Sequence, residues 1–406
     1  MKRIFAFLLF CGLFVGAAHG STGSPLDAQQ SAPADGLVKE SFDNGAPKSE
    51  KTFRNGQLNG PLREYYPNGN LVNVGTYKSG QLNGVFKSYY DDGAVFLEKN
   101  FTNGQLQGTA REYYPNEVLK SWENYQNDVL NGLNQYFYPN GNLKLAMNFK
   151  NGRLNGLTRE YNEDGSLKNE INYEDDHIDG ISKEYGQDGA LYAVWAYKID
   201  QKDGVSRTFY PNGQPEWEMG FKDGNIDGTN KKFARNGKLL IEAPYKNNQF
   251  DGTVKEYHPN GKLKSECQYI DGKKDGLCRE FHDNGNIWVE WNYKNNLKEG
   301  LAREYSQEGQ LWMTVNFQND QKTGAMKEFY ENGAVKQEWT MENGKENGPS
   351  RSYYNTGELM TESAYRDGRL NGVVNLYKKD GNLAYIDTYQ AGTKEGRQVV
   401  GEQEKK

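Results

Sequence analysis

The chain has 406 residues, 35% of them hydrophobic, with a mean hydropathy of −0.95 and a net charge of −6. So little apolar material excludes one large compact core, while 13% aromatic residues argue against a disordered chain, so we expect a thin, elongated protein with narrow apolar stripes. The 49 basic and 55 acidic residues are interspersed, without the basic tract that marks nucleic-acid binding.

Residues 1–20 have the pattern of a signal peptide. Lys2 and Arg3 form a basic start, residues 4–15 form an apolar stretch too short to cross a bilayer, and small residues precede a cleavage point before Ser21. We therefore expect export by a cleaved signal peptide to the periplasm or the outside of the cell, with no transmembrane segment in the mature chain. Residues 21–35 are small and polar, and are predicted to be a disordered linker.

A 24-residue repeat runs from Gly36 to Gly396. Glycine occupies all sixteen positions reached in steps of 24, which defines fifteen copies without insertion or deletion. We write +n for the position n residues after each of these anchor glycines. Position +5 is Tyr or Phe in fourteen copies, +17 is aromatic in fourteen, and +3 is Lys or Arg in thirteen. Residues 397–406 follow as a charged tail.

Each copy is predicted to be a β-hairpin. Asn-Gly or Asp-Gly recurs at +8 and +9, as in Asn68-Gly69, and Gly, Asn or Asp at +20 marks a second turn in every copy. Tyr, Phe, Val and Thr between the turns favour strands, and no stretch shows a sustained helical period. We expect an all-β fold, an elongated single-sheet array of fifteen antiparallel β-hairpin repeats.

The repeat also predicts a strand register. With +8 and +9 at the centre of the first turn, positions that sum to 17 face each other, so +3 faces +14. Position +14 is Glu in nine copies, all with a base at +3, and a continuous row would place each Glu between two bases. One exposed pair contributes about 0.2–1 kcal/mol, so this row would set register more than stability. The aromatic at +17 would face the glycines at +0 and +24.

The same register assigns side chains to two faces. Positions +6, +11, +13, +15 and +17 are largely apolar and should pack. Positions +3, +5, +12, +14 and +16 carry basic, aromatic, lysine, glutamate and small polar residues, and should meet water.

The repeated Glu-Tyr-Tyr, Pro-Asn-Gly and Tyr-x-Asn-Gly motifs resemble the MORN repeat variant of bacterial proteins, including the YwqK-type antitoxin family. Copies Gly60–Gly84, Gly252–Gly276 and Gly348–Gly372 are the most similar, and the resemblance covers residues 36–396. It implies stacked hairpins and a scaffold that associates with proteins or membranes. It implies neither catalysis nor a cofactor.

The tyrosines at +5 are the candidate ligand-binding residues. Beside the basic row they could stack the sugar rings of a polysaccharide, or they could serve only to pack across strands. This ladder comprises Tyr65, Tyr89, Tyr113, Tyr161, Tyr185, Tyr257, Tyr305 and Tyr353.

Two cysteines and three histidines remain after signal cleavage. Cys267 and Cys278 should face each other on adjacent strands, either as a disulfide or as two small apolar residues. His258 and His282 occupy +6 of successive copies, about 9.6 Å apart over two strand spacings, which is too far for one metal ion. We predict neither a metal site nor a catalytic site.

Three functions remain open from the sequence. The first is a scaffold that binds another protein at the cell envelope. The second is an array that binds carbohydrate or cell wall through the +5 ladder. The third is an antitoxin-like immunity protein. The sequence does not define the oligomeric state.

Overall fold

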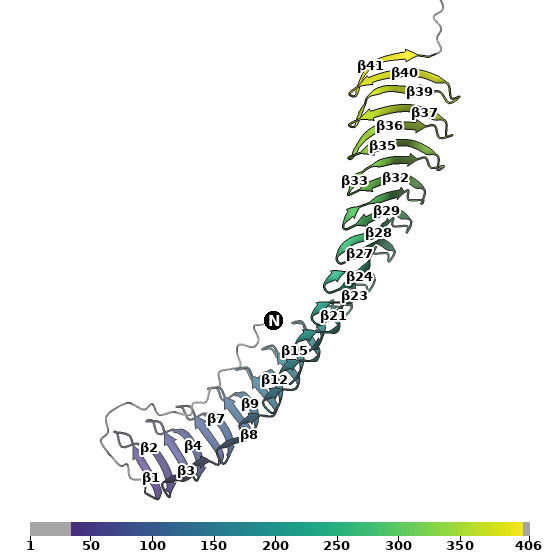
Figure 1. Ribbon diagram of the computed structural model, residues 1–406. Helices are drawn as coiled ribbons and strands as arrows, with labels where there is room; N and C mark the ends of the chain where they lie inside the picture. The colour runs from purple at the N-terminus through teal and green to yellow at the C-terminus, as the bar shows by residue number, and fades with distance from the viewer. Residues whose placement is uncertain (1–33, 401–406) are drawn as a thin grey trace, which may run out of the picture.

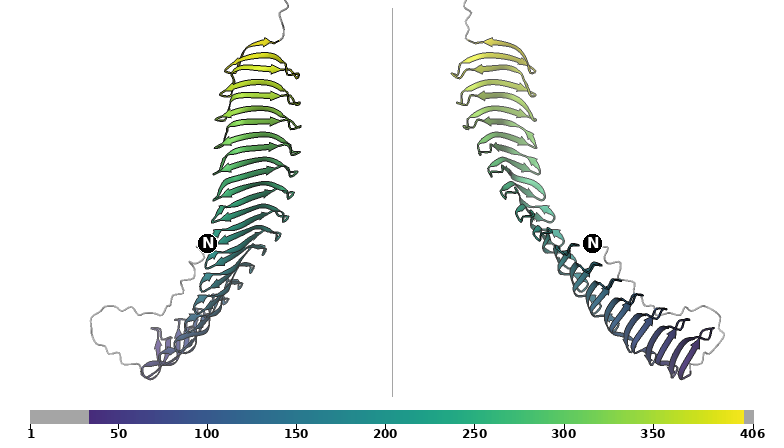
Figure 2. Two further views of the ribbon diagram at one scale, coloured as in Figure 1. Left: turned by 45° about the vertical axis from the view of Figure 1, so that its right-hand side comes forward. Right: turned by 180° about the vertical axis from the view of Figure 1, so that it is seen from behind.

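The computed structural model describes residues 34–400, and all the strands among them belong to one antiparallel sheet (Figure 1). Its 41 strands follow chain order, each long strand pairs with the long strands before and after it, and each two-residue strand pairs with the long strand before it. The sheet is a long curved ribbon with the strands across its long axis, and its twist accumulates from end to end (Figure 2). The all-β, single-sheet prediction is confirmed. The predicted signal peptide and most of the predicted linker lie outside the described residues.

Each repeat contributes two long arms to the sheet. In most copies the first arm is interrupted near the anchor glycine, which leaves a two-residue strand before it. The first arms are β1 (Gly36–Ser41), β3 (Gln57–Tyr65), β6 (Gly84–Tyr89), β8 (Gln105–Tyr113), β11 (Gly132–Phe137), β14 (Gly156–Tyr161), β17 (Gly180–Tyr185), β20 (Gly204–Phe209), β23 (Gly228–Phe233), β26 (Gly252–Tyr257), β28 (Lys273–Phe281), β31 (Gly300–Tyr305), β34 (Gly324–Phe329), β36 (Lys345–Tyr353) and β39 (Gly372–Tyr377).

The second arms are all eight residues long. They are β2 (Pro47–Arg54), β4 (Leu71–Lys78), β7 (Val95–Thr102), β9 (Leu119–Gln126), β12 (Leu143–Lys150), β15 (Leu167–Glu174), β18 (Leu191–Lys198), β21 (Pro215–Lys222), β24 (Leu239–Lys246), β27 (Leu263–Ile270), β29 (Ile287–Lys294), β32 (Leu311–Gln318), β35 (Val335–Glu342), β37 (Leu359–Arg366) and β40 (Leu383–Gln390). The two-residue strands are β5 (Gln81–Leu82), β10 (Val129–Leu130), β13 (Arg153–Leu154), β16 (His177–Ile178), β19 (Gln201–Lys202), β22 (Asn225–Ile226), β25 (Gln249–Phe250), β30 (Leu297–Lys298), β33 (Gln321–Lys322) and β38 (Arg369–Leu370), and β41 (Thr393–Val399) closes the sheet.

The first turn of the repeat differs from the predicted one. The Tyr66 N–H donates to the Asn70 carbonyl and the Gly69 N–H donates to the Tyr66 carbonyl, so +7 and +8 form the centre of the turn. Gly69 has a φ of 90°, and Asn68 has no positive φ. This is a type I turn followed by a left-handed glycine, one residue longer than the predicted turn. The register therefore slips beside it, and +5 faces +11, as in Tyr65 with Leu71.

The second turn lies between consecutive repeats, with its centre between +19 and +20, one residue before the centre that the predicted +17/+24 pairing requires. Asn55 and Gly56 at +19 and +20 both have positive φ, of 51° and 71°, as a two-residue type I′ turn requires. Where +20 is Asp or Asn, its side chain also accepts a hydrogen bond from the neighbouring repeat, as Asp128 does from the Leu106 N–H at 2.7 Å. The residue at +20 thus supplies the turn conformation and a link between turns.

The anchor glycine sits at a bulge and not opposite the aromatic of the preceding repeat. The aromatic Phe53 at +17 faces Gly36 at +0, as predicted, but on its other side it faces Leu58 at +22 instead of Gly60. Gly60 has a φ of 133°, and a Cβ there would lie 2.9 Å from the Thr52 Cβ. The anchor glycines from Gly36 to Gly372 all have positive φ, and this backbone conformation explains why the repeat keeps glycine at this position.

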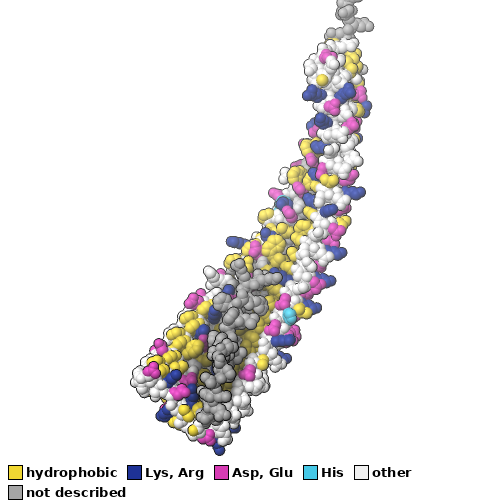
Figure 3. Space-filling view, turned by 60° about the vertical axis from the view of Figure 1, so that its left-hand side comes forward, with side chains coloured by type: hydrophobic (Ala, Val, Ile, Leu, Met, Phe, Trp, Pro, Cys, Tyr) yellow, Lys and Arg dark blue, Asp and Glu magenta, His cyan; other side chains and the backbone are white. Residues whose placement is uncertain are grey.

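Within residues 34–400 the sheet has no second layer, and most of its buried residues are small. They concentrate at +2, +13 and +15, where neighbouring larger side chains cover them. Val289, Asn134 and Ser206 are the largest fully buried side chains in residues 34–400. Met326, Val315 and Met341 form a small apolar cluster. A band of hydrophobic side chains along one face (Figure 3) agrees with the predicted narrow stripes.

Candidate binding surface

The two sides of the sheet carry different chemistry. We call the side with +2, +4, +12, +13, +15, +17 and +22 the aromatic face, and the side with +1, +3, +5, +14 and +16 the charged face. On the aromatic face a lysine at +22 inserts between rings, and the Lys202 Nζ lies 3.2 Å from the Trp195 ring centre and 5.1 Å from that of Phe221. The predicted packing of +13, +15 and +17 is confirmed by their burial here.

Position +12 was assigned to the wrong face. Lys120 at +12 lies 2.7 Å from the carboxylate of Glu112 at +4, on the aromatic face. The bulge beside the first turn causes this, because +5 faces +11 while +4 faces +13, which leaves +12 as the extra residue. The buried row at +2 was not predicted either, because it mixes nine apolar residues with six small polar ones, which weakens the hydrophobic signal. A usable signal existed, since no copy has a charged residue at +2.

The charged face carries the predicted row of bases and glutamates. All nine predicted +3/+14 pairs face each other in the sheet. Glu170 shows the arrangement: Arg159 of its own repeat lies 3.0 Å away and Lys183 of the next lies 3.2 Å away. The hydrogen bond from Arg159 is the largest cause of the lowered pKa of Glu170, which therefore remains ionised. Five of the nine glutamates are bound by bases of two repeats in this way and link them: Glu50, Glu98, Glu170, Glu290 and Glu338.

The glutamates lie beneath their bases. The Glu170 side chain is 14% exposed, against 47% for Arg159 and 42% for Lys183. The Glu50 side chain is 18% exposed, against 64% for Lys39. The outward surface of this row, which has thirteen bases at +3 and nine glutamates at +14, is therefore basic.

The tyrosine ladder at +5 also lies on this face, and its side chains are half-buried. Four of its hydroxyls donate to the +14 glutamate of the preceding repeat, as Tyr353 does to Glu338 at 2.7 Å. Burial, together with this hydrogen bond, raises the pKa of Tyr353 to about 12. The phenols therefore stay protonated and brace the charged row. Sugar stacking by this ladder remains a prediction.

An exposed apolar row runs beside the charged row, at position +1. Six of its large members are 43–56% exposed, namely Leu37, Val85, Leu133, Ile181, Val205 and Val373, while Leu157, Leu277 and Leu301 are half-buried. The asparagines at +16 secure the backbone beneath it, since the Asn148 side chain donates to the Leu157 carbonyl at 2.8 Å, and other copies repeat this bond. Among the six exposed residues, Leu133 and Ile181 accept this bond at their carbonyls. This row was not predicted from the sequence.

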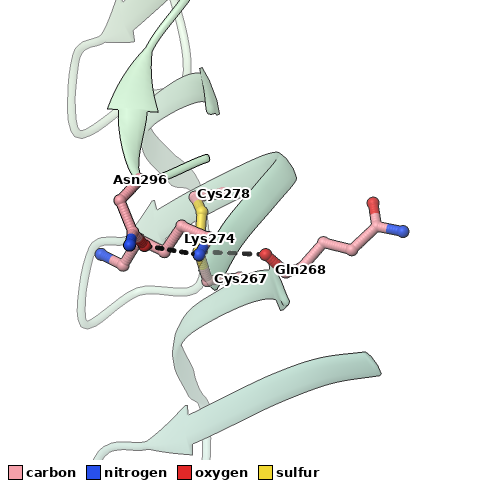
Figure 4. Close-up of a disulfide and its surroundings, with 5 residues drawn as sticks. All are labelled: Cys267, Gln268, Lys274, Cys278 and Asn296. Carbon is pink, nitrogen blue, oxygen red and sulfur yellow. Dashed lines mark hydrogen bonds between the residues drawn. A yellow bond between two sulfur atoms is a disulfide. The ribbon is translucent and has the colours of Figure 1, made fainter. Parts of the chain in front are cut away.

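Cys267 and Cys278 face each other on β27 and β28 and form a disulfide, with 4.0 Å between their Cα atoms (Figure 4). Beside it, the Lys274 N–H donates to the Asn296 side chain at 2.7 Å. The histidines lie apart: His177 pairs with Asp200 at 2.7 Å, and His258 and His282 approach backbone carbonyls. No group of three or more metal-ligating side chains occurs within residues 34–400. That part of the chain contains no helix able to cross a bilayer.

The fold and its surfaces define a class of open-sheet β-hairpin repeat proteins. The family described as MORN repeat variant matches eleven segments, which together cover more than half of the chain, and the protein belongs to this family. The matched segments are 58–79, 82–103, 106–127, 130–151, 154–175, 202–223, 226–247, 250–271, 274–295, 298–319 and 322–343. The copy Gly348–Gly372, predicted to be among the most similar, lies outside these segments.

No curated protein matches the sequence. Among solved structures, the chain is similar to parts of those titled "Crystal Structure of TcdB2-TccC3-Cdc42" and "Crystal Structure of TcdB2-TccC3-TEV", with 11% and 12% identity and a TM-score of 0.17 for each. The matches cover 88% and 87% of this chain but 22% and 20% of those chains, so it spans about a fifth of their length. At this TM-score they carry no argument about fold or function.

Proposed function

We propose that this protein is a non-catalytic scaffold, exported to the cell envelope, whose charged face binds a partner protein with an acidic and apolar surface. The observation that carries the proposal is the exposed apolar row at +1 beside outward-pointing bases at +3. Apolar contact supplies most of the affinity in such interfaces, and charge selects the partner and its orientation.

The shape of the surface favours a protein over a small molecule. The hollows beside Trp339 and Trp312 are open and measure about 200 and 280 Å³, while small ligands favour deeper sites that enclose them. Export is supported by the amino-terminal sequence alone. Amino-terminal sequencing of the protein recovered from outside the cytoplasm should therefore begin at Ser21.

The test is a pulldown from an envelope fraction, with insoluble wall polysaccharide in parallel. The variant combines Leu133→Ser, Ile181→Ser and Val205→Ser in the +1 row. A matched control combines Val129→Ser, Ile270→Ser and Leu297→Ser, which are similarly exposed but lie beside the second turns. We expect one partner protein, captured by the wild type and the control, lost in the variant and weakened by salt. Equal capture by all three proteins, or retention on polysaccharide alone, would refute the proposal.

A further inference from the structure

Position +12 on the aromatic face varies between copies, and in some of them it carries an ion pair. Six copies have lysine there, and four of these lysines lie 2.7–3.1 Å from the glutamate at +4: Lys120, Lys168, Lys264 and Lys336. Two consecutive copies have tryptophan instead, Trp288 and Trp312. Both indoles are about half exposed, at 48% and 46%. An exposed tryptophan is costly in water, and two on adjacent repeats form a single feature.

The strand order places these indoles at a defined spacing. Trp288 lies on β29 and Trp312 on β32, with β31 between them. Two strand spacings separate them by about 9.6 Å. The His282 ring lies 6.1 Å from the Trp288 ring. The hollow of about 280 Å³ beside Trp312 continues the row toward Tyr330.

Replacing lysine by tryptophan leaves a carboxylate free between the two indoles. Glu304 at +4 of β31 faces Val289 on one side and Met313 on the other, the residues that follow Trp288 and Trp312 in sequence. Its carboxylate forms no hydrogen bond or ion pair with residues 34–400, although the residue is half-buried. In the next copy the equivalent Glu328 keeps its lysine, Lys336, at 2.7 Å.

A flat apolar ring beside a free hydrogen-bond acceptor suits a pyranose sugar. The C–H face of the sugar stacks on an indole, while its hydroxyls donate to a carboxylate, which only accepts when ionised. In β-1,4-linked glycans the disaccharide repeats over a length close to two strand spacings. Trp288 and Trp312 can therefore each stack one sugar of such a chain, with Glu304 beside the sugar between them.

We propose that Trp288, Trp312 and Glu304 form a binding subsite for a linear β-1,4-linked glycan. This site is on the opposite face from the proposed protein-binding surface, and neither proposal depends on the other. The main rival occupant is a cationic peptide stacked on the same rings. The Lys336–Glu328 pair neutralises the charge beside Trp312, so Glu304 would be the main anchor of a cation there.

The test measures binding of the full chain to soluble hexasaccharides by calorimetry and by tryptophan fluorescence. The probes are cellohexaose and chitohexaose, with the α-1,4-linked maltohexaose as a linkage control and a lysine hexapeptide for the rival ligand. The variants are Trp288→Ala, Trp312→Ala and Glu304→Gln. Tyr192→Ala is the matched control, because Tyr192 is 54% exposed at the same repeat position but has no aromatic at +12 in either adjacent copy. Circular dichroism of each variant checks that the sheet is intact.

We expect at least one β-1,4 hexasaccharide to bind more tightly than maltohexaose. Each tryptophan variant should weaken that binding by roughly tenfold or more, as loss of a central aromatic contact does. Glu304→Gln should weaken it less, and Tyr192→Ala should leave it unchanged. The proposal fails if neither β-1,4 probe binds, if the variants bind as well as the control, or if only the lysine peptide binds.

Discussion

The aromatic face and the charged face of the sheet differ in what their side chains meet. Met326 and Lys327 are neighbours on β34 and show the contrast: Met326 is 3% exposed in an apolar cluster, whereas Lys327 reaches Glu338 at 3.3 Å with its side chain 42% exposed. Burial stabilises the first face, and ion pairs in water contribute little to the second. A one-layer sheet can thus be stabilised mainly on one side and still expose residues for binding on both.

The test with the largest expected effect removes one side chain from each face and compares the two losses of stability. Met326→Ala should destabilise its region by about 2 kcal/mol or more, because it empties a buried apolar site. Lys327→Ala should change it by about 0.2–1 kcal/mol. Hydrogen exchange of β34 and its neighbours measures both effects, since in a repeat array they remain local. Equal losses of stability from the two substitutions would show that the aromatic face does not stabilise the sheet more than the charged face does.

At the carboxyl-terminal end of the aromatic face, one buried carboxylate is an exception to this contrast between apolar burial and exposed ion pairs. Asp387 is 4% exposed and binds Arg397 at 2.6 and 2.9 Å and Lys394 at 2.8 Å, both on β41. Arg397 and then Lys394 hold the pKa of Asp387 well below its usual range. Asp387→Asn should release β41 and speed amide exchange in Thr393–Val399 roughly tenfold. Unchanged exchange there would mean that backbone pairing alone holds the last strand.

Acid should act chiefly on the charged face. The pKa of Glu50 is lowered mainly by Lys39, and that of Glu338 mainly by the Tyr353 hydroxyl. A lowered carboxyl pKa gives stability that is present above the ordinary value of 4.5 and is lost as the pH falls through the lowered pKa. Exchange in repeats with Glu at +14 should therefore accelerate below pH 4.5 before it does near Gln135 and Ala146, which lack the pair. Uniform acceleration would contradict this.

The smallest effect should come from a single hydroxyl. Tyr353→Phe removes the hydrogen bond to Glu338 and should cost about 1 kcal/mol or less. Because the pKa of Tyr353 is raised from 10.0 to about 12, its bond stabilises the fold fully below pH 10.0 and is lost as the pH rises through about 12. Ultraviolet titration of wild type and variant should show one late-ionising tyrosine fewer in the variant. If the variant instead has one fewer of the tyrosines that ionise near pH 10.0, the Tyr353 hydroxyl forms no such bond in the wild type.

Strict periodicity made much of this fold predictable. A glycine every 24 residues revealed the array, and the charge pairing of Lys39 with Glu50 indicated the correct register away from the turns. Near the turns the prediction failed, because Asn68-Gly69 fits two turn types and only backbone hydrogen bonds distinguish them. That one-residue difference also misplaced +12, and with it Trp288 and Trp312.

Twist gives the surface rows a further property. Neighbouring strands rotate relative to one another, so a row that is straight in the sequence repeat winds around the long axis (Figure 2). A rigid, straight partner can follow such a row over a few repeats before the row turns away from it. Several short partners could then bind one molecule, each pointing in a different direction around the long axis. Covalently linking two of them would raise their avidity only if the linker is long and flexible enough to follow the twist between their sites.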